Sequence, residues 1–173
     1  MSLEVFQDPS VSAFNDVRLA GLLRYWQELR DGARLPSRTD VEPQELGTVL
    51  PWTFLIDVTP LDGFRYRLVG TAIVQEMGYD MTGQLVARAY AGPDWDQIRR
   101  DYDWVIRERR PCLTRNRVML PANGSEYCYS RLLLPLATDG ENVDILLGAA
   151  IADNQSLRRS ESEPRRPAGQ MSP

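Results

Sequence analysis

The chain has 173 residues, of which 43% are hydrophobic and 25% are charged, and its net charge is −4. These values are typical of one soluble globular domain with tails. All 20 basic residues are arginines, because the chain contains neither lysine nor histidine. The missing histidine and lysine exclude a Ser-His-Asp relay, a His-ligated haem or zinc site, a lysine Schiff base and the lysine of a phosphate-binding loop. The acidic balance argues against a general nucleic-acid-binding protein.

The N-terminal sequence MSLEVFQDPSV has neither the basic segment nor the apolar core of a secretory signal. No run approaches the ~18 apolar residues that a membrane span requires. We therefore expect a cytoplasmic protein, in which residues 1–14 form an arm that precedes the domain at 15–153.

Residues 15–31 predict an amphipathic helix, with Asn15 as its N-cap and Gly32 at its end. Its apolar stripe can either close the core of its own chain or pair with a second copy, and the pattern alone does not decide between these. We favour a homodimer, because this helix precedes the predicted sheet. The stripe and predicted dimer interface consist of Leu19, Leu22, Leu23, Trp26 and Leu29.

The next part of the chain predicts a β-hairpin between two short helices. Residues 52–59 and 64–70 are rich in β-branched and aromatic residues and are separated by the turn sequence PLDG. The short helices are expected at 43–50, beginning at a proline, and at 71–78, ending at a glycine. Alternation on the second strand places three side chains on one face: Phe64, Tyr66 and Leu68.

A longer helix and three strands follow. Residues 95–110 form a helical pattern that ends before Pro111. The strands are expected at 112–120, 126–138 and 143–153, and the polar, Pro-rich residues 154–173 are expected to be a disordered tail. The apolar stripe of the longer helix consists of Ile98, Tyr102, Val105 and Ile106.

The dipeptide Asn123-Gly124 is a strong signal for a two-residue hairpin loop. With that loop, Cys128 lies opposite Met119, seven residues along the strand from Cys112. At ~3.3 Å per residue the separation is about 23 Å, beyond the ~7 Å limit for a disulfide. Both cysteines are therefore expected to be thiols. The register puts Tyr127 and Tyr129 on one face and Arg117, Met119 and Cys128 on the other, and leaves open which face looks toward the helices.

Five strands in two antiparallel blocks around a helical insert predict an α+β fold with the architecture of a PAS domain. The segments LPSRTDVEP, FRYRLVGT and GYDMTG resemble a family of small PAS proteins common in alphaproteobacteria, over roughly residues 20–152. This resemblance implies that the short helix after the second strand forms one wall of a cavity. Gly70 would permit a close strand-to-helix turn, and Gly78 and Gly83 can adopt positive φ angles.

The same resemblance implies a ligand that is held noncovalently. A haem-binding PAS domain would use a histidine, and the light-oxygen-voltage kind carries an Asn-Cys-Arg-Phe box on a helix, whereas both cysteines here lie in or beside strands. No cofactor is therefore expected. Arg67, Arg117 and Arg131 are candidate anion anchors, and a buried arginine would favour a small acid. The candidate ligand-binding residues are Phe54, Tyr66, Arg67, Met77, Tyr79, Arg117, Met119 and Tyr129, although ordinary core packing is the alternative for each apolar one.

We expect a sensory module without catalytic output, which signals by association with itself or with another protein. The alternative is a small α+β cone-fold enzyme that transfers protons through Tyr66 with Asp57 or Asp80. A third reading is nucleic-acid binding through residues 99–117, which hold seven arginines against three acids. It requires these arginines to form one exposed patch that is not neutralised by neighbouring acids.

Deletion of residues 154–173 should leave stability nearly unchanged, because a tail with so few apolar groups has little surface to bury. Thermal unfolding of the full and truncated chains tests this. A fall of several degrees in the melting temperature would show that the tail packs on the domain.

Overall fold

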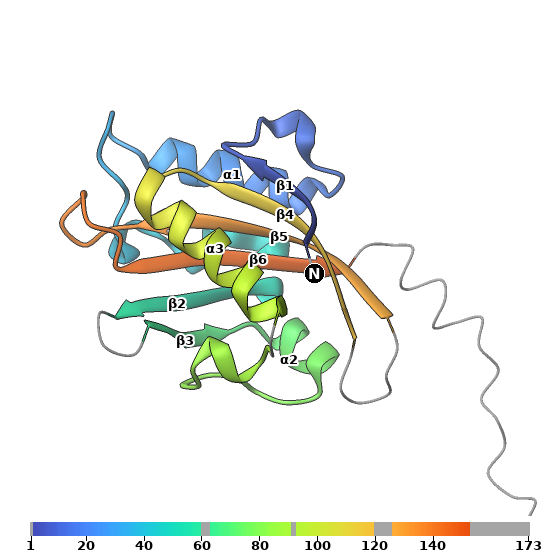
Figure 1. Cartoon of the computed structure of the whole chain (residues 1–173). Helices are drawn as coiled ribbons and strands as arrows, with labels where there is room; N and C mark the ends of the chain where they lie inside the picture. Colours follow the sequence, from blue (N-terminus) through green and yellow to red (C-terminus); the bar gives the residue numbers. More distant parts are fainter. Residues whose placement is uncertain (1, 60–62, 91–92, 120–125, 153–173) are drawn as a thin grey trace, which may run out of the picture.

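In the computed structural model, which describes residues 2–59, 63–90, 93–119 and 126–152, six strands form one antiparallel sheet (Figure 1). Their order across the sheet is β1-β4-β5-β6-β2-β3. The two strands of the first hairpin thus lie beside the last strand rather than beside the strands that follow them. The strands are β1 (Ser2–Gln7), β2 (Thr53–Thr59), β3 (Gly63–Val69), β4 (Cys112–Met119), β5 (Glu126–Leu136) and β6 (Ile145–Ala152).

Helices cover both faces of this sheet (Figure 1). One face carries the N-terminal helix and three 3-10 segments, and the other face carries the two remaining helices and a fourth 3-10 turn. On the first face these are η1 (Val11–Ala13), α1 (Val17–Leu29), η2 (Arg38–Asp40) and η3 (Pro43–Trp52). On the second they are α2 (Thr71–Met77), η4 (Val86–Arg88) and α3 (Pro93–Glu108).

The central strands are apolar almost throughout because both of their faces are buried. On β5, Leu132 and Leu134 face the α1 layer, whereas Leu133 faces the α3 layer. Side chains alternate between the two faces of a strand, so one run of leucines supplies two separate cores. This explains why the sequence RLLLPL lacks the polar alternation of a half-exposed strand.

The predicted α+β, PAS-like fold is confirmed, with one strand more than expected. Residues 2–7, predicted to be part of an N-terminal arm, pair with the edge of β4, where Val5 lies opposite Thr114. A six-residue segment gives little alternation signal by itself. The unpaired hydrogen-bonding groups along the edge of β4 make it a strand.

A bulge changes the face pattern predicted for β3. Leu55 of β2 pairs with Leu68, but the next residue, Ile56, pairs with Tyr66, so that Arg67 is the extra residue. Beyond an extra residue the side chains change face. Tyr66 and Val69 therefore point into the protein and Leu68 is exposed, which corrects the prediction that Leu68 shares a face with Tyr66.

The register of the β4–β5 hairpin also differs from the prediction. Arg117, rather than Met119, lies opposite Cys128. A two-residue shift keeps each side chain on its face, so Tyr129 still lies on the opposite face of the hairpin from Arg117 and Cys128. Cys112 is five residues from Arg117 along β4, and neither cysteine forms a disulfide.

Helix α1 packs on the sheet of its own chain, which contradicts the predicted dimer interface. Leu22 and Trp26 are 2% and 1% exposed, and the Trp26 indole N–H donates to the Pro135 carbonyl oxygen over 2.9 Å. Leu19 and Leu23 are equally buried, and Leu29 packs against the same cluster. An amphipathic stripe looks the same whether it meets a sheet or a second helix, so the pattern did not distinguish the two. The predicted N-cap moves by one residue, because the carboxylate that accepts from the Arg18 amide belongs to Asp16.

The predicted turns at 60–63 and 123–124 and the tail at 154–173 lie wholly or largely outside the described residues. Within the described part of the chain, no helix combines the length and the apolar character that crossing a membrane requires.

Replacing both Leu22 and Trp26 with Glu should unfold the protein rather than release a monomer. Each substitution puts a carboxylate into a core without a partner, at a cost of several kcal/mol, and the typical domain has only about 5–15 kcal/mol of stability. Circular dichroism should show loss of the folded state. The matched control is Arg24→Glu with Gln27→Glu on the exposed face of α1, which should remain folded. A folded double variant L22E/W26E would contradict this packing.

Candidate ligand-binding cavity

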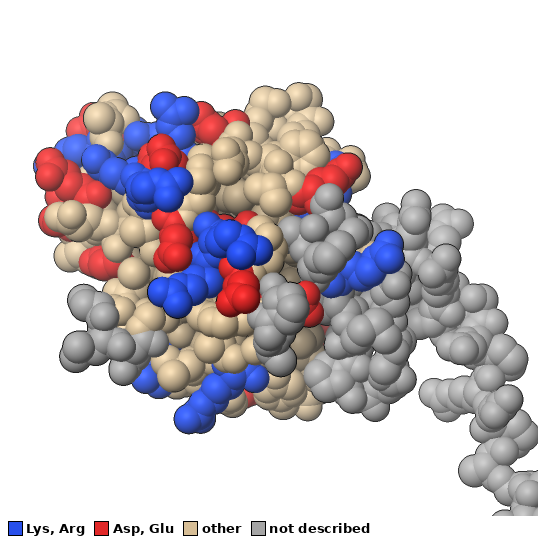
Figure 2. All heavy atoms as spheres, in the orientation of Figure 1, with Lys and Arg blue, Asp and Glu red and all other residues tan. Residues whose placement is uncertain are grey.

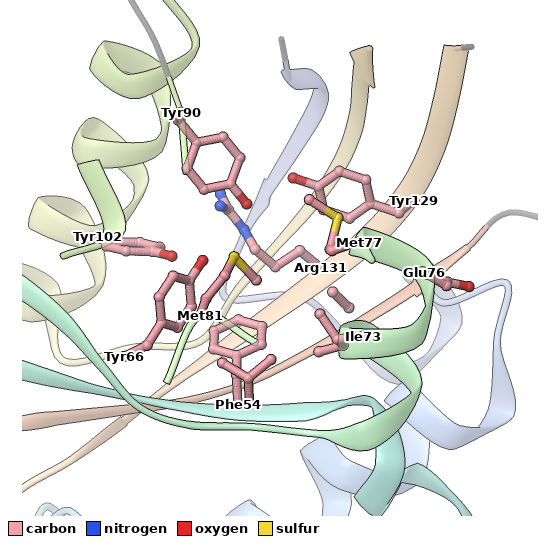
Figure 3. A pocket seen from close by; sticks show the side chains of 12 residues that line it. Phe54, Tyr66, Ile73, Glu76, Met77, Met81, Tyr90, Tyr102, Tyr129 and Arg131 are labelled. Atoms are coloured by element: carbon pink, nitrogen blue, oxygen red, sulfur yellow. The ribbon is translucent and has the colours of Figure 1, made fainter. Parts of the chain in front are cut away.

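A cavity lies between the sheet and the layer formed by α2 and α3 (Figure 3). Its volume is about 50 Å³. Since a water molecule needs roughly 10–15 Å³ measured in this way, the space suits a few waters or one small molecule. Its wall is largely apolar and aromatic, with one arginine and one glutamate. The lining residues are Phe54, Tyr66, Val69, Ile73, Glu76, Met77, Met81, Tyr90, Tyr102, Tyr129, Arg131 and Ala150.

Two glycines allow this wall to form. A β-carbon on Gly70 would lie 2.3 Å from the Pro51 carbonyl oxygen, so only glycine lets the chain turn from β3 into α2 beside η3. A β-carbon on Gly148 would lie 2.1 Å from the ring of Phe54, its partner across β2 and β6. The predicted role of Gly70 in a close turn therefore agrees with the structure. Gly78 and Gly83 both have a φ of +80°, as predicted.

Arg131 of β5 is the one described cation in the cavity wall, and it is 2% exposed. One Nη2 hydrogen is donated to Oδ2 of Asp101, on α3, over 2.6 Å. The guanidinium carbon also lies 5.3 Å from the centre of the Tyr102 ring, in a cation–π arrangement. Its Nε and Nη1 atoms are buried and have no hydrogen-bond partner. Arg131 therefore retains unused donors beside the cavity.

Asp101 balances this charge from the helix side. It is 4% exposed, and its second oxygen accepts a hydrogen bond from the Gln97 amide over 3.0 Å. A carboxylate and a guanidinium this close form a charge-assisted pair, and leaving either partner buried alone would be strongly unfavourable. Burial opposes the charged form of Arg131, but the surrounding phenols and Asp101 raise its pKa overall, so it stays protonated.

Four tyrosines surround the guanidinium, and their hydroxyl groups point toward it (Figure 3). Burial raises the pKa of Tyr66, Tyr102 and Tyr129 above the usual value of 10, and the nearby Tyr90 adds to the rise in each case. These phenols are thus neutral at any ordinary pH. Each can donate one hydrogen bond and accept others.

The polar character continues on the neighbouring strand. Thr114 lies opposite Arg131, and Asn116 lies opposite Tyr129, across the β4–β5 pair. Both side chains are buried, and the Asn116 amide donates to the Thr114 hydroxyl over 2.8 Å. This face of β4 and β5 is polar although the same face of β6 is apolar.

The pKa values of two groups in the core on this side of the sheet, Cys112 and Tyr66, lie far from the range that proton transfer at neutral pH requires. Burial raises the pKa of the Cys112 thiol to about 12, and the pKa of Tyr66 lies well above 10. General acids and bases work best with pKa values near the operating pH. Asp57 instead accepts a hydrogen bond from Arg67, and Asp80 lies in an exposed turn, so the carboxylates of the enzyme alternative do not join Tyr66 in the cavity.

The structure brings together five of the residues that the sequence nominated: Phe54, Tyr66, Met77, Tyr129 and Arg131. Tyr66 and Tyr129 lie on the face toward α2 and α3, which settles the choice that the hairpin register left open. Three other nominations do not line the cavity. Arg67 is the outward bulge residue, Tyr79 is 40% exposed, and Arg117 lies on the opposite face of β4. The side chain of Met119 lies outside the described part.

Sequence reasoning missed several wall residues that come from segments far apart in the chain. Tyr102 was recognised only as part of a helix stripe, and Tyr90 stands in a loop sequence, ARAYAG, that gives no periodic signal. Met81 belongs to the GYDMTG segment, which pointed to this region without giving its role. The remaining missed wall residues are Val69, Ile73, Glu76 and Ala150.

The arginine-rich segment 99–117 does not form one uninterrupted cationic patch. Arg99 pairs with Asp103, Arg107 with Glu108 and Arg110 with Asp8, and blue and red side chains alternate over this region (Figure 2). Arg115 pairs with Glu4 of β1 in the same way. The condition that nucleic-acid binding required is therefore not met. Among the described residues, no group of three acids or cysteines could hold a metal ion.

The sequence model of the PAS domain matches residues 15–151, which is most of the chain. The chain belongs to the PAS-domain family. Its fold is that of PAS domains, to which light-oxygen-voltage (LOV) domains are similar. None of the curated proteins matches the sequence.

Solved structures with this fold include the LOV protein of Rhodobacter sphaeroides, with 18% identity and a TM-score of 0.50. That match covers 64% of this chain and 63% of the other, so the chain spans less than two thirds of that protein. A structure titled RsLOV d2 variant has 16% identity and a TM-score of 0.50, over 83% of this PAS-domain chain and 70% of the other. The PAS domain of Bordetella pertussis BvgS matches with 17% identity and a TM-score of 0.47. This match covers 63% of this chain and 82% of the other. At these identities the likeness concerns the fold.

A double-mutant cycle tests the pair in this PAS domain. Arg131→Met should lower the free energy of unfolding by about 3–5 kcal/mol, because it leaves the Asp101 carboxylate buried without its countercharge, and Asp101→Leu should act similarly. The double variant R131M/D101L should recover most of this loss, because an apolar pair can replace a buried ion pair at little cost. Denaturant unfolding measures all three.

The control is the Arg67–Asp57 pair, whose arginine side chain is 52% exposed. Arg67→Met should change stability by at most about 1 kcal/mol. If the single variants at Arg131 and Asp101 have the same free energy of unfolding as the wild type, the buried ion pair is contradicted.

Proposed function

We propose that this PAS domain senses a small molecule that binds noncovalently in the cavity between the sheet and the α2–α3 layer. The observation that carries the proposal is the buried Arg131, whose Nε and Nη1 have no hydrogen-bond partner beside the cavity. A buried donor without a partner costs about 1–3 kcal/mol, so the fold maintains it at a penalty that a bound acceptor would remove. A cavity that served packing alone would be lined by apolar groups.

The size and chemistry of the site favour no flavin or haem cofactor. A cavity of about 50 Å³ is far smaller than the roughly 300–1,000 Å³ of sites for drug-sized ligands. Both cysteines lie on strands, Cys112 on β4 and Cys128 on β5, rather than on a helix over the cavity. The proposal is thus a noncovalent sensor rather than a photoreceptor.

We propose that the output is a change in association, with no chemical reaction of its own. The tyrosine and cysteine pKa values are shifted away from neutrality, which supports binding over catalysis. Homodimer formation remains part of the proposal, although the buried apolar stripe of α1 does not supply its contact. Exposed apolar side chains such as Val17 at the start of α1 and Leu50 of η3 are available for a second copy or another protein. The proposed setting is the bacterial cytoplasm, in line with the resemblance to alphaproteobacterial PAS proteins.

Filling the cavity should abolish ligand binding without unfolding the protein. Ala150 of β6 lines the cavity and is partly exposed, so Ala150→Phe places a ring in the space that the ligand would use. Native mass spectrometry of the full chain should show a bound small molecule for the wild type and none for Ala150→Phe. The matched control is Gln75→Leu, which enlarges apolar surface on the exposed side of α2 and should keep the ligand. Equal ligand occupancy in Ala150→Phe and the wild type would place the molecule elsewhere.

A further inference from the structure

The charges around the cavity restrict the chemical class of its ligand. Arg131 carries one positive charge, and Asp101 already neutralises it through the 2.6 Å contact. The remaining ionisable acid of the wall is Glu76, a partly buried residue of α2 whose carboxylate points away from the guanidinium (Figure 3). The Arg131–Asp101 pair at the cavity is therefore neutral overall.

An anion would be a poor occupant of this site. It would share one guanidinium with Asp101, leaving a net negative charge in a largely apolar cavity, and an uncompensated buried charge is strongly unfavourable. The sequence-based expectation of a small acid assumed a buried arginine without a countercharge, and Asp101 removes that assumption.

An uncharged oxygen acceptor meets both requirements of the wall. Arg131 offers only donors at Nε and Nη1, and the phenol groups of Tyr66 and Tyr129 can also donate. A carbonyl oxygen accepts two hydrogen bonds and brings no charge. The opposite wall, which includes Phe54, Ile73 and Met77, offers an apolar surface for the rest of the molecule.

We propose that the ligand is a small uncharged carbonyl compound, such as a short ketone, ester, lactone or amide. Its oxygen binds between the Arg131 guanidinium and the tyrosine hydroxyls, and its short hydrocarbon part lies against Phe54, Ile73 and Met77. The inference rests on the proposed sensory function and adds the class of ligand. The small cavity volume limits the compound to a few non-hydrogen atoms.

Two probes of matched size separate the classes: 2-pentanone, which is uncharged, and butyrate, which is an anion at neutral pH. Each is titrated into the full-length protein at pH 7 and followed by amide and methyl NMR. With 2-pentanone we expect saturable shifts at cavity residues such as Met77, Met81 and Ala150, and with butyrate no saturable shifts there. Stronger binding of butyrate than of 2-pentanone would overturn the inference and leave the sensory function standing.

Protein variants test the role of the arginine. In R131M/D101L, which replaces the ion pair by an apolar pair, the affinity for 2-pentanone should fall by roughly tenfold or more, because the charged donors are lost. The matched control is Arg67→Met, which removes an arginine outside the cavity and should leave the affinity unchanged. Unchanged affinity in a folded R131M/D101L would show that Arg131 does not recognise the ligand and would overturn the inference.

Native mass spectrometry of the same wild-type sample distinguishes failure of the carbonyl ligand class from failure of the sensory function. A co-purified compound that is charged, together with no 2-pentanone binding, would refute the carbonyl class alone. If no compound co-purifies and neither probe gives saturable shifts, water is the occupant of the cavity, and both the inference and the sensory function fail.

Discussion

The buried ion pair between Arg131 and Asp101 fixes how the second helical layer sits on the sheet. Arg131 projects from the middle of β5, and Asp101 projects from α3, so their 2.6 Å contact joins strand to helix inside the protein. Neither group tolerates burial without the other. Any packing of α3 that separated them would cost several kcal/mol, whereas apolar contacts such as those of Ile98 and Val105 would allow the helix to slide. Apolar burial thus stabilises this layer, and the ion pair sets its position.

The sheet explains why the pair has room for a cavity beside it. Gly148 and Ala150 on β6 leave little side chain next to Arg131, and the ring of Phe54 occupies the space over Gly148. Gly70 allows α2 to begin directly after β3. Helix α2 then forms one wall of the cavity and does not fill it. Small residues in the sheet and a short helix above it therefore leave a cavity in an otherwise closely packed domain.

The sequence predicted the elements of the fold well and the site only in part, for physical reasons that differ. Periodicity reports which face of an element is apolar, so α1, α3 and the five strands of the core were found. It does not report what covers that face, and for this reason the stripe of Leu22 and Trp26 was assigned to a second copy. Nor does it reveal a bulge, which turned Leu68 outward and Arg67 away from the cavity. Strand β1 was missed because its stability comes from the edge of β4, more than 100 residues away.

The arginine at the centre of the site was nominated from its chemistry, but its counterion was not. Asp101 belongs to a helix rich in arginines and acids, where most such residues pair on the surface, as Arg99 does with Asp103. Only the docking of α3 distinguishes Asp101 from Asp103, its exposed neighbour. That distinction decides the electrostatics of the cavity, because it turns a cationic anchor into a neutral pair.

Asp101 also connects the cavity with the outer surface. It borders a second hollow, which is also lined by Val5 and Gln7 of β1 and by Trp104 of α3. A ligand oxygen that draws the guanidinium toward the cavity competes with Asp101 for the same cation. The strength of the bond between β5 and α3 then depends on occupancy, and the elements that respond, α3 and β1, are surface elements that a partner can contact. In the proposed sensor, the ion pair that positions the layer would also be the point at which ligand binding changes the forces at the surface.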